Sequence, residues 1–80
     1  VAVTHERFVI GRGSGSDLRI DDSNVSRHHA VVELSSGQHV LVDLGSTTGV
    51  YQGDERVTRK VIGDGDEFTI CNHLVAFRYR

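Results

Sequence analysis

The chain has 80 residues, and its nine Lys+Arg against eleven Asp+Glu give a formal net charge of −2 at pH 7. This length allows one small domain with little volume for a deep catalytic cavity. The acidic balance argues against a general nucleic-acid binder, which needs a basic excess to displace counterions. No apolar run approaches the ~18 residues of a membrane span, and residues 1–7 lack a signal-peptide pattern. Cys71 is the only cysteine, so no internal disulfide forms and a cytoplasmic setting is favoured.

The apolar residues alternate with a period of two along most of the chain, which predicts β-strands. Links rich in Gly, Ser, Asn and Asp separate the apolar runs, and those at 35–38, 53–55 and 72–73 predict hairpins. No stretch of eleven residues has a helical apolar stripe. The pattern therefore predicts an all-β sandwich or barrel. In chain order, we expect strands at residues 6–12, 18–20, 29–34, 39–44, 50–52, 56–57, 60–62, 67–71 and 74–79.

Three polar clusters lie where predicted strands end. They are Gly11-Arg12 with the Gly/Ser-rich residues that follow, Ser26-Arg27-His28-His29, and Gly45-Ser46-Thr47-Thr48-Gly49. Hydroxyls, amides and guanidinium groups that converge from several loops can hold a tetrahedral dianion such as phosphate. Taken singly, the clusters are also compatible with a flexible connection, a turn-capping serine and a polar bulge.

The adjacent histidines of the second cluster do not predict a metal site. Neighbouring side chains on a strand point to opposite faces, so His28 and His29 do not readily share one ion. We expect one of them to face inward and the other to face solvent. The sequence therefore predicts neither a metal nor a cofactor.

The order and separation of the clusters resemble the forkhead-associated (FHA) domain. The matching pattern is Gly-Arg, then Ser-Arg-x-His opening a strand, then Asp-Leu-Gly-Ser-Thr-x-Gly, with a late Gly-Asp turn at residues 63–66. The resemblance extends from residue 8 to residue 79. It implies a two-sheet antiparallel β-sandwich of the FHA/SMAD-like type with about 10–11 short strands. A single FHA domain would span residues 1–80, with its first strand missing or shortened.

The same resemblance implies a function and assigns residues to it. FHA domains bind phosphothreonine peptides, so we expect a non-catalytic module that docks a partner or segment phosphorylated by a Ser/Thr kinase. We expect no nucleic acid and no direct membrane contact, and a cytoplasmic location, even within a larger membrane-bound protein. By position, Arg12, Ser26, Arg27 and Thr47 would contact the phosphate, and Gly11, His29 and Gly49 would shape the loops, with His29 facing inward.

One position departs from the family pattern. Thr48 stands where the family usually has an Asn that hydrogen-bonds the peptide backbone beside the phosphothreonine. Threonine has a shorter reach and a single donor, whereas the asparagine amide has two donors and a carbonyl. We therefore expect weaker or less sequence-selective peptide binding than in a domain that carries Asn there.

Three other functions compete with phosphothreonine recognition. An FHA-like domain could serve as a phosphate-independent protein–protein docking surface, which the threonine at position 48 favours. A hydrolase triad could combine Ser26 or Ser46 with His28 and Asp43, but no helix follows either serine to form a nucleophile elbow. Single-stranded nucleic-acid binding needs exposed aromatics beside basic residues. The chain has only five Phe and Tyr residues, and its phenylalanines fit core positions.

Overall fold

The computed structural model describes residues 2–3 and 7–79, which form eleven β-strands and no helix. The described part of the chain accordingly has no helix that could cross a membrane. The strands are β1 (Ala2–Val3), β2 (Arg7–Gly11), β3 (Leu18–Arg19), β4 (Ala30–Ser35), β5 (Gln38–Asp43), β6 (Val50–Gln52), β7 (Glu55–Val57), β8 (Arg59–Val61), β9 (Glu67–Ile70), β10 (His73–Ala76) and β11 (Arg78–Tyr79).

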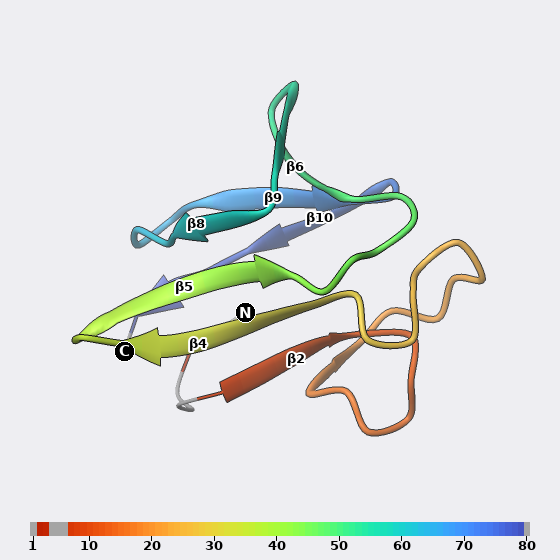
Figure 1. The fold of residues 1–80 in the computed structure, drawn as a ribbon, viewed down its shortest axis with the longest axis horizontal. Coiled ribbons are helices and arrows are strands. Elements are labelled where there is room, and N and C mark those ends of the chain that lie inside the picture. Colours follow the sequence, from red (N-terminus) through yellow and green to blue (C-terminus); the bar gives the residue numbers. More distant parts are fainter. Residues whose placement is uncertain (1, 4–6, 80) are drawn as a thin grey trace.

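Two main sheets face each other in the described residues. One has the strand order β3-β2-β4-β5-β8 and the other β10-β9-β6-β7, while β1 and β11 form a separate pair (Figure 1). The predicted two-sheet sandwich is thus confirmed. Most neighbouring strands are antiparallel, as predicted, and two short pairs are parallel, β2 with β3 and β1 with β11. Because β2 and β3 are parallel, the loop between them returns along the sheet edge to Val9, whose carbonyl accepts the Asp17 N–H at 2.8 Å. The connection that follows β3 therefore begins at the end where β2 ends.

Tight turns set the register of the hairpins. The predicted β4–β5 hairpin turns through Ser36 and Gly37, whose φ angles of 52° and 78° match the twist of the flanking strands. The β9–β10 hairpin differs from the expected one by a single residue. Cys71 has a φ of 56° and occupies the turn, so β9 ends at Ile70 and β10 starts at His73. The predicted strand at 74–79 is also interrupted, since Phe77 separates β10 from β11.

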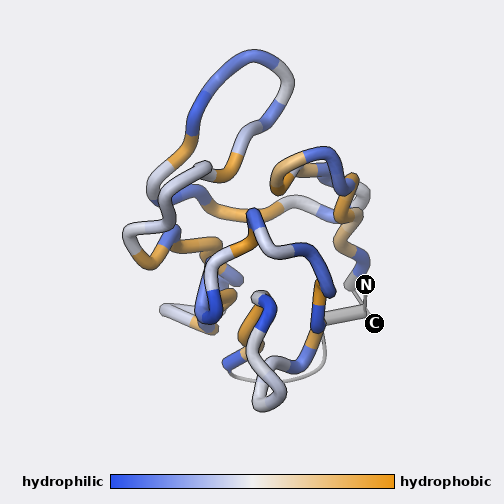
Figure 2. The backbone as a smooth tube through the Cα atoms, turned by 90° about the vertical axis from the view of Figure 1, so that its right-hand side faces the viewer, coloured by the Kyte–Doolittle hydropathy of each residue, from blue (hydrophilic) through white to orange (hydrophobic). Residues whose placement is uncertain are grey.

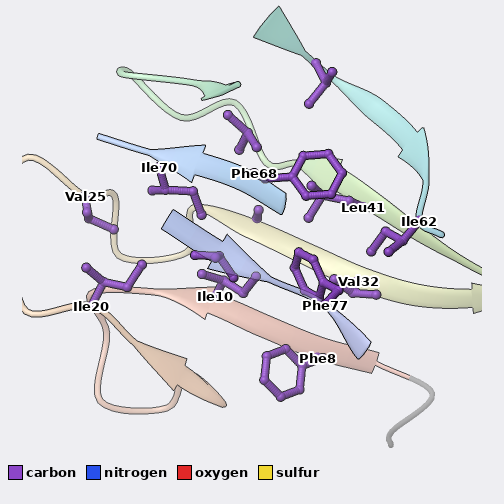
Figure 3. Close-up of a cluster of buried hydrophobic side chains, with 14 residues drawn as sticks. Phe8, Ile10, Ile20, Val25, Val32, Leu41, Ile62, Phe68, Ile70 and Phe77 are labelled. Atoms are coloured by element: carbon purple, nitrogen blue, oxygen red, sulfur yellow. The ribbon is translucent and has the colours of Figure 1, made fainter. Parts of the chain in front are cut away.

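The core fills the space between the sheets. Phe8 and Ile10 on β2, Phe68 and Ile70 on β9, and Phe77 belong to one buried cluster (Figure 3). Phe68 and Phe77 meet edge to face with their ring centroids 5.7 Å apart. Burying such a side chain contributes about 1.5–3 kcal/mol. A chain this small depends on each of these contacts.

The core also anchors the long connection between β3 and β4. Ile20 and Val25 from this connection are 9% and 1% exposed and belong to the same cluster as the strand residues (Figure 3). The first half of this connection is therefore anchored in the core, and the polar residues between and after the two anchors are held at one end of the sandwich.

Candidate functional site

A pocket of about 310 Å³ lies at the end of the sandwich where β2 and β5 end. Figure 2 looks onto this end, where the nearest loops are mostly hydrophilic or neutral. The structure brings all three sequence clusters to this pocket, although they are separated along the chain. Its lining residues are Arg12, Ser23, Asn24, Val25, Ser26, Thr47 and Thr48.

Arg12 is oriented by hydrogen bonds to the loop that faces it. Its side-chain Nε donates to the Val25 carbonyl at 3.0 Å, and its backbone N–H donates to the Ser26 carbonyl at 3.0 Å. Within the described part of the chain, no carboxylate forms an ion pair with the guanidinium. The Nε bond leaves the two terminal amino groups for a ligand. A half-buried guanidinium without an anion is arranged to receive one.

Ser26 and Thr47 add hydroxyl donors to the same pocket. Ser26 is half-buried and Thr47 is exposed, and neither hydroxyl forms a hydrogen bond with another described residue. Each hydroxyl carries one rotatable O–H that can turn toward an acceptor oxygen. With Arg12, they supply donors from three separate connections around one space, which suits a group with several acceptor oxygens.

His29 joins two of these connections from beneath. It is fully buried, its Nδ1 accepts the Ser26 backbone N–H at 3.1 Å, and its Nε2 lies 2.8 Å from the Gly49 carbonyl. Because Nδ1 is the acceptor, the ring proton belongs on Nε2, which donates to Gly49. The imidazole therefore holds the Ser26 loop against the loop that carries Thr47.

Two glycines permit close backbone packing around the site. A Cβ at Gly11 would lie 2.2 Å from the Arg27 carbonyl oxygen, so no side chain fits there. Gly49 has a φ of 81°, and a Cβ there would lie 2.7 Å from Nε of Arg56. The Gly49 N–H donates to the hydroxyl of buried Ser46 at 3.1 Å.

Thr48 is engaged with the protein itself. Its hydroxyl donates to the Asn24 carbonyl at 3.3 Å and lies 3.2 Å from the thiol of Cys71 in the β9–β10 turn. The Cys71 thiol in turn lies 3.3 Å from the same carbonyl. Thr48 therefore lines the pocket and also connects three loops, a role that its sequence position did not suggest.

A second tie links the β3–β4 loop to the β9–β10 turn. Oδ1 of Asp22 accepts the Asn24 backbone N–H at 2.9 Å, and Oδ2 accepts a hydrogen bond from His73 Nε2 at 2.9 Å. The Asn24 N–H, with a smaller effect from His73, holds the pKa of Asp22 below its ordinary value of 3.8. The carboxylate thus organises the turn that leads into Ser26.

Arg27 is separated from two of the other predicted phosphate contacts, Ser26 and Thr47, but shares a pocket with the third, Arg12. Its exposed side chain lines a neighbouring pocket, together with Arg12 and Arg19, rather than the one that holds Ser26 and Thr47. Sequence reasoning also missed Ser23 and Val25 as lining residues. No signal in the sequence identifies these residues, because a loop's path decides which of its residues face a pocket.

The residues of the imagined hydrolase triad are not assembled. His28 is exposed in another pocket with Arg7, Val9 and Leu44. Asp43 Oδ1 accepts the Ser46 backbone N–H, and the Ser46 hydroxyl accepts the Gly49 N–H. In the described part of the chain, no hydrogen bond joins His28 to either serine, so the geometry lacks a base beside a nucleophile.

The comparisons with known proteins agree with this architecture. Residues 8–71 match the FHA domain family. The chain is 41% identical over 70 residues to the transcriptional regulatory protein EmbR of Mycobacterium tuberculosis, covering 86% of this chain and 18% of that protein. It is 40% identical over 67 residues to the glycogen accumulation regulator GarA of Mycolicibacterium smegmatis, covering 84% of this chain and 42% of that protein.

A solved structure of Mycobacterium tuberculosis EmbR in complex with a low-affinity phosphopeptide superposes with a TM-score of 0.87 at 36% identity. The match covers 95% of this chain and 20% of that one. The chain thus spans less than half the length of these curated relatives. A β-sandwich with donor-bearing loops at one end and a family match over residues 8–71 define the class: the chain belongs to the FHA domain family.

Gly11→Ala tests the close approach of β2 to the Arg27 loop. The new methyl group must displace backbone, so we expect a loss of about 1–3 kcal/mol in the free energy of unfolding, measured by urea denaturation. Gly15→Ala is the matched control, because nothing lies within 4 Å of its Cβ position. Equal stability of the two variants would contradict the packing described for Gly11.

The lowered pKa of Asp22 predicts a pH-dependent contribution to stability. Because the folded-state pKa lies below the unfolded one, the carboxylate stabilises the fold above about pH 4. That contribution is lost as the pH falls through the folded-state value. We expect the unfolding free-energy difference between the wild type and Asp22→Asn to be present at pH 5 and to shrink as the pH falls below 3.8. Asp54→Asn, in the exposed β6–β7 turn, controls for general charge effects, and a difference that is the same at all pH values would disprove the assignment.

Proposed function

We propose that this FHA domain recognises a phosphothreonine-containing segment of a partner protein through the pocket at the loop end of the sandwich. The observation that carries the proposal is the convergence of an unpaired Arg12 guanidinium with the Ser26 and Thr47 hydroxyls in one open pocket. Arg12, Ser26 and Thr47 bind the phosphoryl oxygens. Gly11, His29 and Gly49 hold the loops at the spacing that this contact needs.

The charge and geometry of a phosphoryl group fit this donor set. At pH 7 the group carries about 1.5–2 negative charges and three acceptor oxygens. A charge-assisted hydrogen bond is worth about 1.5–3 kcal/mol, so a few such bonds account for reversible binding in a shallow site. The complex of EmbR with a phosphopeptide supports this ligand class for a chain that is 36% identical to it.

The proposed role is that of a binding module without catalysis. The partner is a protein phosphorylated by a Ser/Thr kinase, or the kinase itself, in the cytoplasm. The relatives are named as regulators, which supports a signalling role. Preference for phosphothreonine over phosphoserine comes from the family, and a phosphoserine peptide tests it.

A phosphate-independent docking surface remains the second candidate. The observation that favours it is that the Thr48 hydroxyl is already bonded to the Asn24 carbonyl, which leaves this side chain less able to grip a peptide backbone. The two functions differ in one measurable property, which is the ratio of affinities for the phosphorylated and bare forms of one peptide.

Arg12→Ala tests the phosphate site. We expect calorimetric titration with a phosphothreonine peptide to show at least a tenfold loss of affinity, since one charge-assisted contact of about 1.5–3 kcal/mol disappears. The wild type should bind the bare peptide far more weakly than the phosphorylated one. Arg78→Ala is the control, because this exposed arginine on β11 is not among the residues that line the pocket. Thermal unfolding establishes that each variant is folded.

Two results would count against the proposal. Wild-type affinity in folded Arg12→Ala would remove the phosphate site. Equal wild-type affinity for the phosphorylated and bare peptides would instead support the docking surface.

Thr48→Asn tests the peptide-backbone contact. The longer amide can reach the ligand and has both donors and an acceptor, so we expect affinity for a phosphothreonine peptide to rise about two- to tenfold, the value of one neutral hydrogen bond. Thr58→Asn, an exposed position after β7, is the matched control. Unchanged affinity in Thr48→Asn would mean that this position does not limit peptide binding.

A further inference from the structure

A second pocket adjoins the proposed phosphate site and has an unusual lining. It has a volume of about 320 Å³ and is formed by Gly13 and Ser14 together with three arginines, Arg12, Arg19 and Arg27. Arg12 borders both pockets. The two pockets are therefore adjacent and share Arg12.

The charge at this pocket is opposite to that of the chain. The whole sequence has a net charge of −2, yet three of its arginines gather around one surface hollow. In the described residues, neither Arg12 nor Arg27 is paired with a carboxylate. The Arg19 Nη2 atom lies 3.9 Å from Asp21 Oδ1, with both side chains more than half exposed. Such an exposed pair contributes little and exchanges readily with another anion.

The backbone holds the arginines in this arrangement. Arg19 Nε donates to the Arg12 carbonyl at 3.1 Å, and the Gly13 N–H donates to the Arg27 carbonyl at 3.0 Å. A Cβ at Gly13 would lie 2.9 Å from Cγ of Arg27. The absence of a side chain at position 13 thus lets the Arg27 stem lie against the loop that carries Arg12.

We infer that Arg19 and Arg27 form a subsite for a second anionic side chain of the same phosphothreonine peptide. This inference rests on the proposed function, because the phosphothreonine in the first pocket brings the peptide to the second one. An Asp or Glu carboxylate and a second phosphoryl group share the required chemistry, since a guanidinium fork binds either of them in a bidentate manner. Because Arg12 borders both pockets and an extended peptide advances about 3.3 Å per residue, the second anion lies within a few residues of the phosphothreonine.

The inference assigns Arg27 a role different from direct contact with the first phosphate. If Arg27 bound the phosphothreonine itself, its loss would weaken every phosphothreonine peptide by the same factor. As a subsite residue, it affects only peptides that carry a second anion. The two roles are therefore separable by the choice of peptide.

The test is a calorimetric titration of four peptides that each carry one phosphothreonine. One has only neutral flanking residues, one has Glu residues on the N-terminal side, one has Glu residues on the C-terminal side, and one has a second phosphothreonine. Each is titrated into the wild type, Arg19→Gln, Arg27→Gln and the matched control Arg78→Gln. Arg78 is an exposed residue of β11, away from both pockets.

We expect Glu on one side only to raise the wild-type affinity about three- to tenfold over the neutral peptide, the value of one or two exposed charge pairs. A second phosphate within reach should raise it at least as much, since its charge is larger. Arg19→Gln and Arg27→Gln should each reduce this gain and leave the affinity for the neutral peptide unchanged. Arg78→Gln should retain the gain, and 0.5 M salt should diminish it.

The outcomes distinguish the inference from the proposed function. If the neutral phosphothreonine peptide binds and neither acidic flank nor second phosphate adds affinity, the subsite is overturned and the proposed function stands. If Arg27→Gln weakens all four peptides equally, Arg27 belongs to the first site and the inference is wrong. If no phosphorylated peptide binds, both fail.

Discussion

The hydrogen bonds of His29 are the contact on which the rest of the site depends. This buried imidazole receives the Ser26 backbone N–H on one nitrogen and donates to the Gly49 carbonyl with the other. Buried polar groups are costly unless they are satisfied, and here each ring nitrogen has a partner. The two loops that supply the pocket's hydroxyls are therefore held at one spacing before any ligand arrives.

Around this contact, individual hydrogen bonds and apolar anchors position the loops, in place of a large core. Ile20 and Val25 anchor the β3–β4 loop in the hydrophobic cluster, and Asp22 ties the same loop to His73. Thr48 and Cys71 share the Asn24 carbonyl. Loops that are fixed in advance lose less conformational entropy on binding, which favours the ligand binding proposed for this shallow site.

The electrostatics of the molecule are local. A chain with an overall negative charge concentrates arginines at its loop end, where Arg12 separates two pockets. Arg12 Nε donates to the Val25 carbonyl, and this bond aligns the guanidinium. The two terminal nitrogens of Arg12 are left for the proposed ligand. The position of a few cations, and not the net charge, determines what this end of the sandwich attracts.

The sequence by itself determined the class of fold and the three clusters. Alternating apolar residues and Gly-marked turns indicate short strands, because strand periodicity and positive φ are local properties. The sequence did not predict every turn correctly. Cys71 takes a left-handed conformation that its residue type does not favour, so the strand predicted at 67–71 ends at Ile70. The parallel β2–β3 pairing was likewise hidden, since strand pairing depends on contacts between distant segments.

Only the tertiary structure decided which residues of each cluster share a pocket. Adjacent residues Ser26 and Arg27 line different hollows, because Arg27 lies in a turn and the path of the loop decides which space each side chain enters. The engagement of Thr48 with the Asn24 carbonyl and the Cys71 thiol spans 24 and 23 positions of sequence. Residue type and spacing do not predict such contacts, because they form only when the packed sheets bring the loops together.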